Sequence, residues 1–294
     1  MSGQDDPPAA LRRAWHELDA LNERFYRRHA ASFSRTRQRA WPGWSTVLTL
    51  ASERLAALPG EGVRLLDVAC GNARLLDALP APAAGGARWT YVGVERSLPL
   101  LAAARRRIGE LGQPTPTEPR HALLAADLLR ADEWPLVAGE RRCFDLVVAF
   151  GLLHHVPGRV QRDELLRRAG DLVRPGGLVA VSFWQFLALP ALRARRIDPA
   201  VAVDLGAISR ATAERLEPGV VLHDSGDTET REGVAGPLPR EADAIRFCHS
   251  ASDEEIDALL DGSFPAPIWS PVARFSSDGR SGTLNAYAML QRAP

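Results

Sequence analysis

The sequence predicts an α/β fold in which a mostly parallel β-sheet carries helices on both faces and is closed by an antiparallel hairpin. Short apolar runs, typical of buried strands, alternate with amphipathic helical segments over residues 61–184. Near the C-terminus, alternating segments at 267–275 and 284–292 flank the polar stretch SSDGRSGT, as in a hairpin. A length of 294 residues suits one large domain with additions.

Residues 1–60 are expected to form an N-terminal helical cap that belongs to the same domain. Apolar side chains at spacings of three and four predict an amphipathic helix from about residue 11 to residue 30. A second helix is expected from about 45 to 58, because Pro59 and Gly60 end it. The apolar stripe of the first helix comprises Leu11, Trp15, Leu18, Leu21, Phe25 and Tyr26.

The core, residues 61–184, is predicted to alternate parallel strands with helices. Its apolar runs are too short for buried helices, and helical periodicity separates most of them. Such an alternation places helices on both faces of one sheet. Strands are expected at 63–69, 89–95, 121–127, 144–151 and 177–184, and helices at 72–79, 97–111 and 162–173.

Residues 185–294 are expected to hold a substrate-side insertion, followed by a helix and the hairpin that completes the sheet. Ser252 and Glu255 have the spacing of a capping box, which predicts a helix that runs to about Leu260. Within 185–245, LALPALRARR is compatible with a helix and DSGDTETREGVAGPLPRE is typical of a loop, so the fold of this stretch stays open.

Composition excludes several classes of protein. The formal net charge is zero, which does not favour a general nucleic-acid binder. No apolar run approaches the roughly 20 residues of a membrane span, and the acidic start lacks the features of a signal peptide. Three scattered cysteines predict neither a disulfide framework nor a metal site, and they fit a cytoplasmic protein. These cysteines are Cys70, Cys143 and Cys248.

Candidate cofactor-binding residues follow the predicted strands, where ligands bind in open α/β sheets. Small residues after the first strand would let the backbone approach a ligand closely. Glu95, after the second strand, could accept hydrogen bonds from ribose hydroxyls, and Asp127, after the third, could accept one from an adenine amino group. The full set is Asp67, Ala69, Gly71, Asn72, Glu95, Asp127, Leu128 and Phe150.

These segments, in this order, resemble the class I S-adenosylmethionine-dependent methyltransferases. The matching segments are DVACGNA, VGVE, AADLL, FDLVVAFGLLHHV and LVRPGGLVAVSFW. The resemblance implies a Rossmann-like methyltransferase sheet and S-adenosylmethionine as the cofactor. Ala69 and Ala73 stand where the family often has glycine. A dehydrogenase is the weaker interpretation because G-x-G-x-x-G is absent, whereas a non-catalytic partner subunit that binds S-adenosylmethionine stays open.

His154 and His155 follow the fourth strand and are candidate catalytic residues. Methyl transfer from a sulfonium needs a base only if the acceptor carries a proton at working pH. A carboxylate does not, so the histidines would then position the acceptor instead of deprotonating it. Which of the two faces the substrate stays open, and nothing in the sequence predicts a metal at this pair.

Residues 25–44 resemble the N-terminal element of the wobble-uridine tRNA carboxymethyl methyltransferases, and RFCHSASDEEIDALL resembles part of their C-terminal region. The matching residues are Phe33, Ser34, Thr36, Arg37, Trp41 and Pro42. The resemblance implies methylation of a carboxymethyl group on the wobble uridine of tRNA. Arg37 would then hold a carboxylate or phosphate, and Trp41 would stack on a base. Eukaryotic enzymes of this kind need a small zinc-binding activator subunit, which leaves such a partner open.

A small-molecule acceptor on the same scaffold is the alternative. Trp41 would then pack the N-terminal helices, and Arg37 would hold the cofactor's carboxylate. Eight arginines and three acids lie between Arg12 and Arg39, an excess of five positive charges that also fits a solvated helix face. If RNA binds, arginines at 24–39 and 193–196 should line one rim of the cofactor pocket.

Overall fold

The structure is a computed structural model that describes residues 7–36, 38–56, 62–80, 88–111, 121–134, 137, 143–224 and 241–294. Its centre is a seven-stranded sheet in the order β3-β2-β1-β4-β5-β10-β9. The first five strands in this order are parallel, and β10 pairs antiparallel with both β5 and β9. The strands are β1 (Gly62–Val68), β2 (Arg88–Glu95), β3 (His121–Ala125), β4 (Phe144–Ala149), β5 (Val173–Trp184), β9 (Trp269–Ser277) and β10 (Asn285–Arg292).

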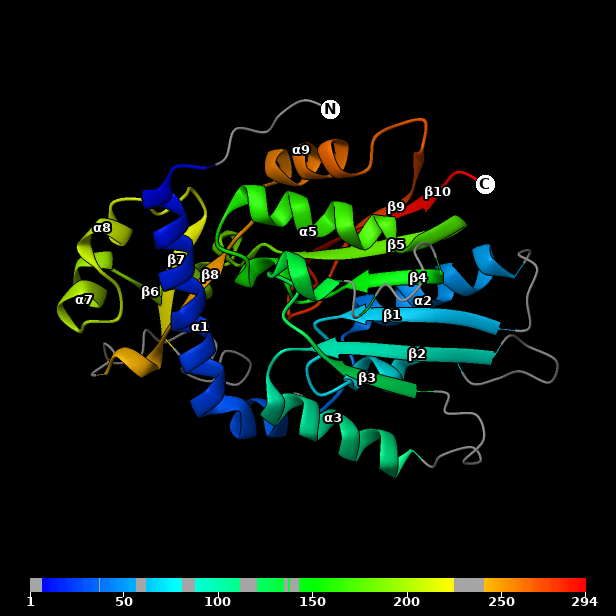
Figure 1. Cartoon of the computed structure of the whole chain (residues 1–294), viewed down its shortest axis with the longest axis horizontal. Coiled ribbons are helices and arrows are strands. Elements are labelled where there is room, and N and C mark those ends of the chain that lie inside the picture. Colours follow the sequence, from blue (N-terminus) through cyan, green and yellow to red (C-terminus); the bar gives the residue numbers. More distant parts are fainter. Residues whose placement is uncertain are drawn as a thin grey trace.

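Helices cover both faces of this sheet, as the alternation of strands and helices predicts (Figure 1). On one face, α5 (Arg159–Asp171) and α9 (Asp253–Ser263) pack through Leu165, Leu166 and Ile256. On the other, α2 (Pro42–Leu55) and α3 (Leu98–Glu110) contribute Val47 and Ile108. Each face therefore has its own apolar core, with the fully buried central strand β4 between the two.

A second, smaller sheet lies beside the carboxyl ends of the parallel strands. It has the antiparallel order β6-β7-β8, made of β6 (Arg196–Ile197), β7 (Val220–Asp224) and β8 (Ile245–His249). The short helices α6 (Pro190–Arg193), α7 (Pro199–Asp204) and α8 (Arg210–Ala213) accompany it. The sequence analysis did not assign a fold to residues 185–245. The strands of the small sheet are only two to five residues long, too short to show a clear strand pattern.

The N-terminal helix α1 (Ala9–Thr36) runs across the small sheet toward α3 (Figure 1). Leu18 and Leu21 pack into the core of the small sheet with Ile197, Leu222 and Phe247. The helix extends beyond both ends of the predicted 11–30. Residues 1–60 thus supply a helix that joins the main sheet to the insertion.

Several element boundaries differ from the sequence prediction. The segment predicted as a helix at 72–79 is a 3₁₀ turn, η1 (Arg74–Ala78), and β5 already begins at Val173. The N-cap of α9 is confirmed, since the Ser252 side chain accepts the Glu255 backbone N–H. The reciprocal half of the predicted capping box is not formed. The Glu255 side chain instead contacts His249 and Arg162.

Among the helices that the structure describes, none combines the length and hydropathy needed to cross a membrane. The hairpin predicted near the C-terminus is confirmed by the β9–β10 pairing. The predicted loop DSGDTETREGVAGPLPRE, residues 224–241, lies outside the described residues except for its first and last residue.

Candidate active site at the carboxyl edge of the sheet

A cavity of about 910 Å³ opens where the parallel strands end. This is the edge at which open α/β sheets bind ligands. The size suits a nucleotide-like ligand with a second small group beside it. One end is formed by the loops after β1, β2 and β3, and the other by α1, β8, the end of β5 and the 3₁₀ turn η3 (Leu153–His155). Predicted site residues in its wall are Trp41, Ala69, Gly71, Glu95, Asp127, Leu128, His154 and His155.

The turn after β1 brings the backbone to the cavity. Ala69, Gly71 and Ala73 all have left-handed φ angles, of 61°, 57° and 56°. A Cβ built on Gly71 would meet no atom within 4 Å, so open space lies beside it. The two alanines that depart from the glycine-rich pattern therefore keep the backbone shape that glycine adopts more readily.

Glu95, at the end of β2, lies in the part of the cavity that the loops after β1, β2 and β3 form, which we call the cofactor end. Its Oε2 accepts the Gly71 backbone N–H at 3.0 Å, and its Oε1 accepts that of Ser97 at 2.7 Å. Burial raises the pKa of this carboxyl above its ordinary value, although the two backbone donors oppose the shift. Each oxygen keeps a second lone pair, so the carboxylate is positioned to accept ribose hydroxyls.

Asp127 and Leu128 line the cavity after β3. Asp127 Oδ1 accepts the Leu129 N–H at 3.0 Å, and its own N–H donates to Glu133 Oε2 at 2.6 Å. Arg96 lies 3.4 Å from Asp127 Oδ2 and 2.7 Å from Asp19 of α1. The predicted adenine segment is therefore a turn fixed by its own backbone contacts.

The structure does not bring Asp67, Asn72 and Phe150 into the cavity wall. The Asp67 carboxylate is buried and accepts the Tyr91 hydroxyl at 2.8 Å. Burial raises its pKa to about 7, and the charge of nearby Glu95 adds to that shift. Asn72 is buried in the turn, and Phe150 stacks on Trp44 at 5.7 Å. All three residues are buried outside the cavity wall, and their contact with a cofactor stays a prediction.

His155 is held by α1 through both ring nitrogens. Asn22 Oδ1 accepts the Phe247 N–H at 3.0 Å, so Asn22 Nδ2 faces His155 Nδ1 at 3.2 Å and donates to it. The imidazole proton is therefore on Nε2, which donates to the Tyr26 hydroxyl oxygen at 2.7 Å. An imidazole fixed in this tautomer orients its neighbours and is poorly placed to accept a further proton.

His154 lies against the cavity between two rings. Its ring centroid is 3.8 Å from that of His155 and 4.5 Å from that of Trp184. Both histidines line the cavity, so which member of the pair contacts an acceptor stays a prediction. The sequence left this choice open because adjacent residues on a 3₁₀ turn point in different directions.

Trp41 lines the cavity, and the guanidinium of Arg74 lies 5.5 Å above its ring. Trp41 also packs against the core formed by α2, so both predicted roles, stacking and packing, are compatible with its position. Arg37 lies outside the described residues, and so do the side chains of Phe33 to Thr36. The assignment of Arg37 therefore stays a prediction.

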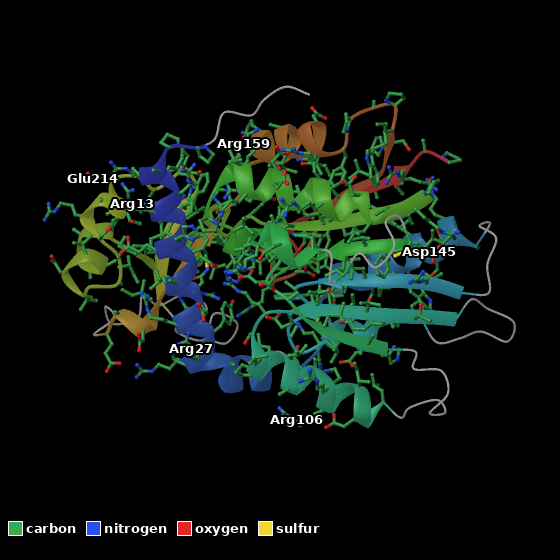
Figure 2. All side chains as sticks on the ribbon, viewed as in Figure 1. Arg13, Arg27, Arg106, Asp145, Arg159 and Glu214 are labelled. Atoms are coloured by element: carbon green, nitrogen blue, oxygen red, sulfur yellow. The ribbon has the colours of Figure 1, made fainter. Side chains whose placement is uncertain are left out.

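Of the described arginine side chains at 24–39 and 193–196, only that of Arg27 lines the cavity. Arg24 donates to the Ala207 carbonyl at 3.2 Å, and Arg28 pairs with Glu241 and Asp243 at 3.0 and 2.8 Å. Arg27 lines the cavity but pairs with Glu23 at 2.6 Å. Figure 2 shows other arginines, including Arg106 and Arg159, on opposite sides of the molecule. The main electrostatic support for RNA binding is thus weakened.

The sequence analysis did not single out four residues at the other end of the cavity, formed by α1, β8, the end of β5 and η3, which we call the acceptor end. Asn22, Tyr26, Trp184 and Arg246 all line it. Asn22 interrupts the apolar stripe of α1 at a fully buried position, which is one signal. Tyr26, Trp184 and Arg246 lie in the segments quoted above for their resemblance to known families, which is another. Among the described residues, no group of three or more His, Cys, Asp and Glu side chains could hold a metal ion.

Comparisons with known proteins agree with this geometry. Residues 66–179 match the family described as "Methyltransferase domain". The fold is similar to that of 1,6-didemethyltoxoflavin-N1-methyltransferase from Burkholderia thailandensis, with a TM-score of 0.55 at 16% identity over 99% of this chain and 93% of that one. That structure contains bound S-adenosylhomocysteine. The chain thus carries a methyltransferase domain on the fold of the S-adenosylmethionine-dependent methyltransferases.

Two curated relatives differ in their acceptors. The tRNA (carboxymethyluridine(34)-5-O)-methyltransferase of Saccharomyces cerevisiae is 26% identical over 159 residues, 54% of this chain and 46% of that protein. A ubiquinone biosynthesis O-methyltransferase of Azorhizobium caulinodans is 32% identical over 124 residues, 42% of this chain and 41% of that protein. The matches span less than half the length of either relative.

Proposed function

We propose that this chain, which carries a methyltransferase domain, transfers the methyl group of S-adenosylmethionine to a carboxymethyl group on the wobble uridine of tRNA. The observation that carries the transferase part is the cavity, which joins a cofactor end at Gly71 and Glu95 to a second end at His154. An enzyme of this class must hold both molecules in one enclosed space with little water.

The residues at the cofactor end fit S-adenosylmethionine. Glu95 offers a buried carboxylate at the end of β2, and open space lies beside the Gly71 backbone. Asp127 and Leu128 would hold the adenine. When bound, S-adenosylmethionine supplies a methyl group on a positively charged sulfur, which becomes a neutral thioether once an acceptor oxygen takes the methyl.

The residues at the acceptor end fit an acceptor that needs no deprotonation. His155 is hydrogen-bonded through both nitrogens, and His154 packs between His155 and Trp184. A carboxylate loses no proton when it becomes an ester, so these side chains need only orient it and exclude water. This chemistry and the yeast relative together support the carboxymethyl acceptor.

A small-molecule O-methyltransferase is the second candidate, and one observation favours it. Arg24 and Arg28 are engaged in contacts with the insertion, so α1 presents fewer free cations for phosphates than its sequence suggests. The bacterial relative named for an O-methyltransferase of ubiquinone biosynthesis also matches this domain.

The test is transfer of radiolabelled methyl from S-adenosylmethionine to bulk tRNA and, in parallel, to a small-molecule extract. If tRNA is the acceptor, we expect radioactivity in the tRNA that mild alkali releases, because a methyl ester hydrolyses readily. Alkali-stable counts in tRNA would contradict the ester, and counts only in the extract would favour the second candidate. A Glu95→Ala variant serves as the inactive control in both arms.

A further inference from the structure

Arg246 of β8 is a buried cation in the wall of the acceptor end of the cavity. Only 3% of it is exposed, and its guanidinium lies 5.4 Å from the Phe25 ring and 5.6 Å from the Trp184 ring. Within the described part of the chain, its one hydrogen bond runs from Nη1 to the Tyr26 hydroxyl oxygen at 3.4 Å, and its buried Nε makes none. Among the described residues, no carboxylate forms an ion pair with it.

Two other buried arginines show how this protein normally satisfies such a group. Arg162, 2% exposed, pairs with Glu217 at 3.1 Å and Glu255 at 3.0 Å. Arg292, 9% exposed, donates to the carbonyls of Gly170 and Val173 at 3.1 and 2.9 Å. Both lie away from the cavity. A buried guanidinium that lacks acceptors is costly, and Arg246 differs from these two because, among the described residues, neither a carboxylate nor a backbone carbonyl accepts from it.

The surroundings of Arg246 leave an anion as the missing partner. Aromatic faces attract the cation but do not accept its N–H groups in the plane of the guanidinium. Its single hydrogen-bond acceptor, Tyr26, also accepts from His155. The guanidinium and His154 line the same end of the cavity, whereas the carboxylates Glu95 and Asp127 belong to the cofactor end. A carboxylate matches the planar fork of a guanidinium.

We propose that Arg246 binds the carboxylate of the methyl acceptor and selects acceptors by charge. The inference rests on the proposed methyl transfer, but it holds for a carboxylate on RNA or on a small molecule. The carboxylate loses its charge when it becomes an ester, so the ion pair is stronger before transfer than during it. Arg246 therefore contributes mainly to binding, and its loss should raise KM more than it lowers kcat.

The experiment compares Arg246→Met, Arg246→Lys and a matched control, Arg27→Met. Arg27 also lines the cavity but is exposed and paired with Glu23. The probes are phenylacetate and its neutral analogue phenylacetamide, titrated into the protein saturated with S-adenosylhomocysteine, with melting temperature as the readout. Methyl transfer to an anticodon stem-loop RNA that carries 5-carboxymethyluridine is measured separately.

We expect phenylacetate, but not phenylacetamide, to raise the melting temperature of the wild type and of Arg27→Met. Arg246→Met should lose this preference, and Arg246→Lys should keep it in weaker form. On the RNA, Arg246→Met should raise KM about 10- to 100-fold, the range for a charged hydrogen bond. The affinity for S-adenosylhomocysteine should change less than about twofold, since a substitution outside the cofactor end couples weakly to the residues that bind the cofactor.

The ligand-free Arg246→Met protein should melt at or above the wild type, because a buried cation without an anion has been replaced by an apolar group of similar length. A large fall in its melting temperature would instead make Arg246 a structural residue and overturn the inference. So would a carboxylate preference that survives in Arg246→Met, one that is missing in the wild type, or an equal loss of S-adenosylhomocysteine affinity. Failure of RNA methylation with the preference intact would overturn only the tRNA acceptor.

Discussion

The two ends of the cavity are built in different ways. At the cofactor end, polar groups find partners near them in sequence, as Glu95 does with Gly71 and Ser97, 24 and 2 residues away. At the acceptor end, the partners are far apart along the chain. Asn22 reaches His155 and Phe247 over 133 and 225 residues. The cofactor end is therefore built mainly from the loops after β1, β2 and β3, whereas the acceptor end exists only when α1 and β8 dock on it.

The two ends also differ in how their charged groups are paired. At the cofactor end, the carboxylates of Asp127 and Glu133 pair with Arg96 and Arg130, at 3.4 and 3.0 Å. At the acceptor end, the buried cation Arg246 has no carboxylate partner among the described residues. An anionic acceptor would supply the charge that Arg246 lacks. Substitutions at one end should therefore leave ligand binding at the other largely unchanged.

The largest expected effect concerns Asp67, beneath the cofactor end. Its pKa of about 7 lies above the ordinary 3.8 because burial disfavours the charged form. The unfolded chain ionises near pH 4 and the folded chain near pH 7, so folding stability falls as pH rises through this window. The full loss is about 4 kcal/mol, at 1.36 kcal/mol per pH unit.

Asp67→Asn should remove this loss, because the amide can still accept the Tyr91 hydroxyl and carries no charge. The measurement is the free energy of unfolding of ligand-free wild type and variant between pH 4.5 and pH 8. We expect the variant to gain on the wild type as pH rises. A constant difference between the two across that range would contradict the raised pKa.

The next effect separates the two ends directly. Glu95→Ala should weaken the binding of S-adenosylhomocysteine about 100-fold, since it removes the acceptor for ribose and leaves the Gly71 and Ser97 N–H groups without their partner. Glu23→Ala, which removes another acid from the cavity wall on α1, should change that affinity less than about twofold. Calorimetry on both variants is the measurement, and equal affinities would remove Glu95 from the cofactor site.

A smaller effect is expected at Asn22, which connects α1 to the histidine pair and to β8. Asn22→Ala should destabilise the protein by about 2 kcal/mol, because it leaves a buried backbone N–H and a ring nitrogen unsatisfied. It should lower kcat/KM for the acceptor while the affinity for S-adenosylhomocysteine stays unchanged.

Asn22→Asp is the control for this prediction. It keeps an acceptor for Phe247 but cannot donate to His155, so it separates the histidine tautomer from packing. Denaturant unfolding and steady-state kinetics give the two readouts. Loss of cofactor affinity in Asn22→Ala would show that the two ends are coupled and would break the comparison.

The fold of the core was predictable because its signals are local. Apolar runs bounded by turns predicted all five parallel strands, and the alternation at 267–292 predicted the β9–β10 hairpin. The rule that ligands bind beyond strand ends predicted a set of cofactor-binding candidates, of which Ala69, Gly71, Glu95, Asp127 and Leu128 line the cavity. The small sheet had no such signal, since β6 is only two residues long.

The sequence by itself determined the cofactor end of this protein, because the residues there belong to short segments whose spacing reports their position on the sheet. It predicted Asp67 beside them, and only the folded structure shows its carboxylate turned to Tyr91 beneath the cavity. At the acceptor end, the sequence predicted the histidine pair, and the tertiary structure added the residues that surround it. Arg246 is one of many arginines in the chain, and its burial beside Tyr26, with no carboxylate partner among the described residues, follows from the docking of α1 and β8.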